Sequence, residues 1–179
     1  MGRDQYIVYE ETTPWSWWVS ALVWGSFLAG AVPVAVAVLG RIADGISPGE
    51  LPALLMLAGG GFLLLLGPWM TQVLVGRLHV RVTRTSLLIQ LGVLPILSKL
   101  IPFDEIDWLE PVRYRPMRDF GGWGIRFGKD KRAWTIRGDA AVLLHMKDGP
   151  DVYLGSDDPE KLAQRIRSAA AGRFDGRGE

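Results

Sequence analysis

Two long uncharged stretches constrain this chain more than any other feature of its sequence. Residues 12–40 and residues 51–76 contain no Asp, Glu, Lys, Arg or His. A helix needs about 20 mostly apolar residues to cross the roughly 30 Å hydrocarbon core of a bilayer. Both stretches exceed that length, so the sequence predicts two membrane-spanning helices, at about residues 14–39 and 50–76.

Local signals predict where these helices begin. Thr13 is a suitable N-cap and Pro14 a suitable first residue for the first helix. Ser47 and Glu50 have the spacing of a capping box ahead of the second helix. The connector, at about residues 40–47, is short, and we therefore expect an antiparallel hairpin.

The flanking charges favour a membrane hairpin over a cleaved signal peptide and indicate its orientation. Signal peptides begin with basic residues and have a shorter apolar core, whereas Glu10 and Glu11 precede the first apolar run. Basic residues gather after the second helix, at Arg77, Arg81 and Arg84, and are sparse in the connector. The positive-inside rule then places both chain termini in the cytoplasm.

Four tryptophans should lie at one end of this hairpin: Trp15, Trp17, Trp18 and Trp69. They fit an aromatic belt at the level of the lipid headgroups, or a docking surface for another membrane protein or a large cofactor. Small residues that allow close helix approach recur four apart in the first helix: Gly25 with Ala29, Ser26 with Gly30, and Ala31 with Ala35. Their expected partner is the second helix, and the alternative is a helix of another chain.

The rest of the chain differs in charge and in period. Residues 1–76 carry two basic and five acidic residues, and residues 77–179 carry 18 basic and 14 acidic ones. From Leu78 apolar residues alternate with polar ones, which is typical of half-buried strands. Turn residues at 128–131, 138–139 and 147–149 separate further strands, expected at about 86–93, 96–101, 106–115, 123–127, 132–137, 140–146 and 151–155. Asp158 and Pro159 then begin a C-terminal helix that should end at Gly172.

Three segments resemble bacterial membrane proteins that carry a pleckstrin-homology-like (PH-like) domain. These are Ile101 to Ile106, with its Ile-Pro followed by Ile, the longer segment Val112 to Arg126, and Gly155 to Leu162. The resemblance covers about residues 78–171, and a preceding helical hairpin is common in that group. It implies a protein of the bacterial inner membrane with a small antiparallel β barrel or sandwich capped by a C-terminal helix, and it implies no activity.

The expected fold class is therefore an α+β membrane protein with two transmembrane helices followed by a PH-like β domain. Residues 1–76 form the N-terminal segment and the hairpin, residues 77–172 form the β domain with its C-terminal helix, and residues 173–179 form a polar tail.

Patterns that carry catalysis or cofactor binding are missing from the sequence. The chain has no Cys, which excludes disulfides, thiol chemistry and Cys-ligated metals. It also lacks a phosphate-binding loop, a nucleophile elbow and a zinc-protease or calcium-loop motif. His79, His145 and the acidic turn at 104–107 are expected at ordinary solvated or hydrogen-bonded positions. We therefore predict no catalytic residue, no cofactor, no metal and no enzymatic activity.

The most informative polar feature is a group of arginines beside Trp123: Arg113, Arg115, Arg118 and Arg126. Arg113 and Arg115 are two positions apart in an expected strand and should share a face. The group is either a solvated edge with carboxylate partners such as Asp119, or a basic, aromatic-bearing patch for anionic headgroups or an acidic protein surface. A nucleic-acid partner is not expected, because no binding motif accompanies the charge.

These features predict a non-enzymatic accessory or scaffolding subunit of a larger membrane complex, such as a respiratory or photosynthetic one. Its expected partners are membrane proteins and the lipid bilayer. The alternative is a membrane-surface sensor that binds anionic lipid or a peptide through the arginine patch.

Overall fold

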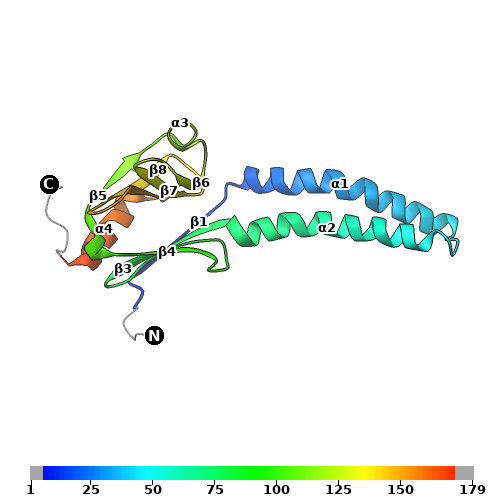
Figure 1. Ribbon diagram of the computed structural model, residues 1–179, viewed down its shortest axis with the longest axis horizontal. Coiled ribbons are helices and arrows are strands. Elements are labelled where there is room, and N and C mark those ends of the chain that lie inside the picture. The colour runs from blue at the N-terminus through cyan, green and yellow to red at the C-terminus, as the bar shows by residue number, and fades with distance from the viewer. Residues whose placement is uncertain (1–5, 172–179) are drawn as a thin grey trace. The chain divides into compact units, whose positions relative to one another are not determined.

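The computed structural model describes residues 6–171, which form two compact units (Figure 1). One unit is helical and comprises Ser16–Val73. The other contains the chain before it, up to Trp15, together with the chain after it, from Leu74 onward. The helical unit is thus inserted between two segments that fold together.

Two helices build the helical unit, α1 (Trp17–Asp44) and α2 (Leu51–Val75). At 1.5 Å per residue they are about 42 and 38 Å long. Within these two helices only Ala31 and Pro68 are buried, and most of the other residues are exposed, although most are apolar. By length and composition both helices could span a membrane.

Close packing of α1 on α2 uses some of the expected small residues. A Cβ placed on Gly30 of α1 would lie 3.4 Å from Leu64 Cδ1, so Gly30 faces α2. Gly25, in contrast, has nothing within 4 Å of that position. The tightest approach involves a glycine of α2, since a Cβ on Gly67 would lie 2.5 Å from the ring of Phe27.

The segment before α1 is a strand, β1 (Tyr9–Pro14), which corrects the expected helix start at Thr13 and Pro14. β1 pairs antiparallel with β2 (Arg77–Val82), and Pro14 lies opposite Arg77. Thr13 is buried in this pairing, and Pro14, which has no N–H to donate to a ladder, ends the strand. The capping signal is local, and pairing with a strand on the far side of the hairpin outweighs it. α1 begins three residues later than expected, after Ser16.

The remaining strands form two sheets. β1 and β2 continue into β3 (Ser86–Leu91) and β4 (Leu97–Pro102) as an antiparallel sheet of order β1-β2-β3-β4. A 3-10 turn (Phe103–Glu105) leads into a five-stranded sheet of order β5-β8-β9-β7-β6. Its strands are β5 (Ile106–Arg113), β6 (Gly124–Phe127), β7 (Lys131–Thr135), β8 (Ala140–Met146) and β9 (Asp151–Gly155), and a short helix, α3 (Pro116–Phe120), connects β5 to β6.

The expected strands after residue 76 are all present. Of the two alternatives, a barrel or a sandwich, the barrel is excluded because the two sheets do not close. The expected antiparallel pairing is wrong for one pair, since β7 pairs with β9 in parallel orientation. The parallel pair follows from the strand order. The chain leaving β7 leaves one strand position empty before it forms β8, and β9 then returns antiparallel to β8 into that position, beside β7. The turn at Gly138 and Asp139 marks where the chain reverses but does not specify which strands become neighbours.

The C-terminal helix α4 (Pro159–Ala170) completes the core that both sheets share. Its fully buried residues include Leu162 and Ile166, as the apolar pattern predicts. Asp158 Oδ1 accepts a hydrogen bond from the Lys161 backbone N–H at 3.1 Å, which confirms the expected N-cap. The expected helix end at Gly172 and the tail at 173–179 lie outside the described residues.

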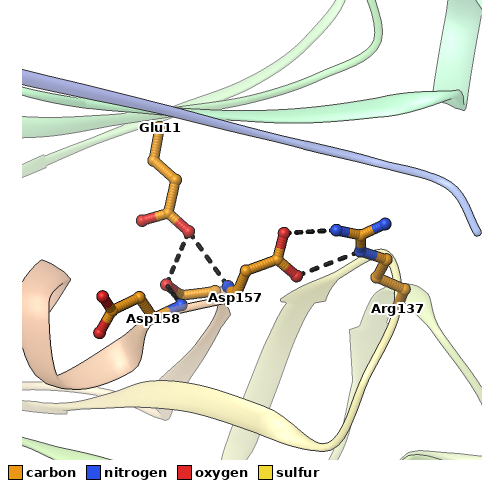
Figure 2. A network of polar contacts seen from close by, with 5 residues as sticks. Glu11, Arg137, Asp157 and Asp158 are labelled. Atoms are coloured by element: carbon orange, nitrogen blue, oxygen red, sulfur yellow. Dashed lines mark hydrogen bonds and ion pairs between the residues drawn. The ribbon is translucent and has the colours of Figure 1, made fainter.

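Glu11 links β1 to the start of α4 (Figure 2). Its Oε1 accepts hydrogen bonds from Ser156 Oγ at 2.7 Å and from the Asp157 backbone N–H at 3.1 Å. The Asp157 carboxylate in turn accepts two hydrogen bonds from Arg137, at 3.1 and 2.5 Å. A strand, a helix start and the β7–β8 connection are thereby held together.

Candidate functional site

The arginines predicted as a group lie around the short helix α3. Arg113 ends β5, Arg115 is the N-cap residue of α3 and Arg118 lies within α3. Trp123 immediately precedes β6, and Arg126 lies within β6. Strand β5 therefore ends before Arg115, although Arg113 and Arg115 are both exposed on either side of the buried Tyr114. We use the name α3 surface for Arg113, Arg115, Met117, Arg118, Trp123, Arg126 and Phe127.

Local chemistry explains why a helix forms at this point. Pro116 occupies the first helical position, where its missing N–H costs nothing. The Asp119 carboxylate accepts a hydrogen bond from the Arg115 backbone N–H at 2.8 Å and so satisfies a donor at the helix start. Gly121, with φ +70°, ends the helix and donates to the Met117 carbonyl at 3.2 Å.

An aromatic cluster supports α3 from beneath. The rings of Tyr114, Phe120 and Tyr153 lie 5.1 to 5.9 Å apart between centroids, in edge-on or tilted arrangements. Burial raises the pKa of Tyr114 and that of Tyr153, so both phenols are neutral at physiological pH. The α3 surface therefore rests on a packed base that includes β9.

Trp123 positions the β6 side of the surface. Its indole Nε1 donates to the Gly138 carbonyl at 2.8 Å, and its own carbonyl accepts from Arg126 Nε at 3.1 Å. The Arg126 guanidinium consequently lies over Gly122, where a Cβ would come within 3.2 Å of Nη2. Gly122 has φ +130°, so a side chain there would also be strained.

The arginines differ in how far they are neutralised. Arg113 approaches Asp139 at 3.6 Å, but its side chain is 84% exposed. Within residues 6–171, no carboxylate lies within 4.0 Å of the guanidinium of Arg115, Arg118 or Arg126, and of these guanidinium groups only that of Arg126 has a backbone partner, the Trp123 carbonyl. Asp119, the carboxylate expected to partner them, is instead hydrogen-bonded to backbone. Two adjacent cations are thus left for an external partner.

Apolar side chains that the sequence did not single out stand among these cations. Met117 is 69% exposed and Phe127 is 74% exposed. Phe127 also borders an open depression of ≈ 420 Å³, lined by Asp119, Phe120, Ile125, Arg126, Phe127 and Gly128. Strand alternation predicts that Phe127 shares a face with the half-buried Ile125, so its exposure was not expected. The exposure of Met117 follows from the helix at 116–120, which the sequence did not predict.

The tryptophans assigned to the membrane interface belong to both units. Trp15 packs against the core of the β unit, and its backbone N–H donates to the Gly76 carbonyl at 3.1 Å. Trp17, Trp18 and Trp69 are exposed on the helical unit. Phe27 contacts Gly67 and Gly30 contacts Leu64, so the two helices run antiparallel. The same register places Trp69 level with residue 25, which is about 12 Å from Trp17 along the helix axis.

The two histidines have polar partners, as expected. His79 Nδ1 lies 2.9 Å from Thr12 Oγ1. His145 Nδ1 lies 2.9 Å from Asp151 Oδ2, and its ring stacks on Trp108 with centroids 3.8 Å apart. Among the residues that the structure describes, no group of three or more His, Asp or Glu side chains could hold a metal ion.

Comparisons with protein-family models, with curated proteins and with solved structures found no match. What stands from the structure alone is two long apolar helices and a two-sheet β unit with a C-terminal helix. None of these comparisons supports the expected resemblance to PH-like membrane proteins.

Proposed function

We propose that this chain is a non-enzymatic accessory subunit of a larger membrane complex. In this proposal α1 and α2 anchor it in a bacterial inner membrane, with both termini in the cytoplasm, and the β unit is a PH-like domain. The α3 surface binds an acidic region of a partner membrane protein.

One observation carries this proposal: two arginines without a carboxylate partner, Arg115 and Arg118, flank the exposed Met117 above packed aromatic rings. Arginine, methionine and tryptophan are the residue types enriched in protein–protein interfaces. A cation without a carboxylate of its own gains a charge-assisted hydrogen bond from an acidic partner without first losing one. The nearby apolar side chains add buried area to the same contact.

The anchor is supported by the chemistry of the helices. Both are longer than the roughly 30 Å of hydrocarbon that they would cross, and their exposed residues are mostly large and apolar. An apolar surface of this extent is unfavourable in water and is stable in lipid. The basic residues that follow α2, beginning with Arg77, favour the cytoplasmic side for the β unit.

The test is photo-crosslinking of the full-length chain in native membranes, with a photoreactive amino acid at position 117. We expect an adduct with one membrane protein, with a yield that falls as salt is raised, because charge pairs at an exposed surface are screened. Reversal of both unpaired cations, as Arg115→Glu with Arg118→Glu, should weaken the association at least about tenfold, which corresponds to about 1.4 kcal/mol.

Lys147→Glu is the matched control, because it reverses an exposed cation at the opposite end of the β5–β8 pair, about 20 Å away. Its adduct yield should equal that of the unaltered chain. A chain that leaves the membrane in mild detergent as a free monomer, or that crosslinks only to lipid, contradicts the subunit role. The second of these results would favour the lipid-sensor alternative.

A further inference from the structure

The connection between β3 and β4, together with the first residue of β4, exposes a run of apolar side chains. Val93 is 54% exposed and Ile96 is 68% exposed, and Leu94 and Leu97 are also exposed. We call Val93–Leu97 the apolar loop. Turns on a water-facing surface are usually built from polar residues and glycine, and a contiguous exposed apolar patch marks a contact surface.

The position of this loop within the β unit is defined by backbone pairing. The Gly92 N–H donates to the Arg77 carbonyl at 2.6 Å, immediately before the loop begins. Arg77 is only two residues beyond Val75, the last residue of α2. The apolar loop therefore lies at the end of the four-stranded sheet at which the chain arrives from α2.

A buried side chain holds the start of the loop in place. The amide nitrogen of Gln90 donates to the carbonyls of Gly92 at 3.2 Å and Val93 at 3.0 Å. Gly92 adopts φ +84°, a conformation that side chains disfavour, so the chain turns sharply there. The exposed side chains are thus presented by an ordered turn.

We propose that the apolar loop inserts into the headgroup–acyl boundary of the bilayer that α1 and α2 cross. This inference rests on the membrane anchor of the proposed function. Gly76 is the last residue of the uncharged stretch, and two residues of chain extend at most about 7 Å. A membrane boundary near Val75 therefore brings the loop to the lipid surface.

The side chains beside the loop suit that boundary. Exposed apolar residues next to a cation are the composition of segments that bind at membrane interfaces. Arg77 is exposed at the same end of the sheet, and a long basic side chain can keep its apolar stem in lipid while its charge contacts phosphate. We therefore expect the apolar loop to contact lipid. The test also distinguishes contact with a partner protein or with a second copy of the chain.

The experiment uses single-cysteine variants of the full-length chain, which has no Cys of its own. Each carries an environment-sensitive fluorophore and is reconstituted into vesicles of phosphatidylcholine and phosphatidylglycerol with or without brominated acyl chains. Ile96→Cys tests the loop, Leu63→Cys reports the middle of α2, and Lys147→Cys reports a water-facing turn. We expect a blue shift and bromolipid quenching at positions 96 and 63, and iodide quenching alone at position 147.

The outcomes separate this inference from the proposed anchor. Bromolipid quenching at 63 with iodide quenching at 96 leaves the anchor intact and overturns the insertion of the loop. A label at 96 that neither quencher reaches is covered by protein, which also overturns it. If position 63 is quenched by iodide, the anchor itself fails. In a Val93→Cys chain, the added change Ile96→Asp should abolish bromolipid quenching, because a charge resists entry into lipid.

Discussion

At the scale of single residues, the neighbours Glu10 and Glu11 show how burial decides what a carboxylate contributes. Glu11 is half-buried and accepts hydrogen bonds from the buried Ser156 hydroxyl, which is only 6% exposed, and from the Asp157 backbone N–H. Glu10 points to the other face of β1 and pairs with Arg81 at 2.8 Å on the surface. Removing a partner costs most where the group left behind cannot reach water.

Glu11→Ala should therefore lower the free energy of unfolding by about 1–3 kcal/mol, because the Ser156 hydroxyl and a backbone N–H lose their acceptor. The matched change Glu10→Ala breaks an exposed ion pair and should cost at most about 1 kcal/mol. Chemical unfolding of the full-length chain in detergent measures both. Equal losses for the two variants would show that the link between β1 and α4 adds nothing to stability.

His79 makes stability depend on pH. Burial, with help from Arg81, lowers its pKa below the ordinary value of 6.5, so the unfolded chain binds a proton more readily than the folded one. The contribution of His79 to stability should be fully present above pH 6.5 and should be lost as the pH falls from there toward the folded pKa. When the pH is lowered from about 7.5 to about 5, the His79→Gln variant should lose less stability than the unaltered chain. His145 is present in both chains, so its titration does not contribute to the difference. Parallel curves would show that His79 does not titrate differently on folding.

At the scale of elements, the sequence predicted the strands that depend on neighbouring residues and missed the pairings between residues far apart in the chain. Strands after residue 76 are built from local alternation and turn residues, and β2 to β9 lie within a few residues of their expected bounds. β1 was missed because its partner is separated from it by the whole hairpin, and Tyr9 to Thr13 alternates too briefly to predict a strand alone. The order of the strands in the sheet could not be predicted either, because the turn at Gly138 is the same whichever strand pairs with β7.

In the candidate site, too, the residue types were predictable from the sequence and their structural surroundings were not. The arginines and Trp123 stand out as residue types, and they do lie around one element. What makes Arg115 and Arg118 available is that Asp119 bonds to backbone at the start of α3. A five-residue helix is too short to leave a periodic signal. The exposure of Met117 follows from that same helix and could not be anticipated.

The helical hairpin depends on glycines of α2 that the spacing of small residues in α1 did not reveal. Gly67→Ala would place a methyl group 2.5 Å from the ring of Phe27, and such overpacking costs about 1–3 kcal/mol. Gly60→Ala is the matched control in the same helix, because nothing lies within 4 Å of its Cβ position. It should be neutral or stabilising by up to about 1 kcal/mol, through the better helix propensity of alanine.

Thermal unfolding of the two variants in detergent, followed by the far-ultraviolet circular dichroism of the helices, measures this difference. A Gly67→Ala chain as stable as Gly60→Ala would mean that α1 and α2 do not pack through Phe27 and Gly67.

At the scale of the whole molecule, the hairpin is an insertion in the connection between two paired strands. β1 and β2 are neighbours in the sheet, with Pro14 opposite Arg77, and the Trp15 N–H reaches the Gly76 carbonyl. A β unit cut at residue 77 therefore lacks its edge strand, the buried Thr13 and the carboxylate of Glu11. It would expose the unpaired edge of β2, which favours aggregation.

Replacing residues 16–73 with about four Gly and Ser residues should give a β unit that folds without detergent, because a short turn suits two strands already in register. The fragment 77–179 should not fold, or should unfold at much lower denaturant concentration. Proton NMR dispersion and urea unfolding distinguish the two. The joined chain carrying Glu11→Ala provides an intermediate control, since it keeps β1 but loses the link to α4. If the fragment unfolds as cooperatively as the joined chain and at the same urea concentration, β1 is dispensable, and the helical hairpin is an appendage of the domain rather than an insertion within it.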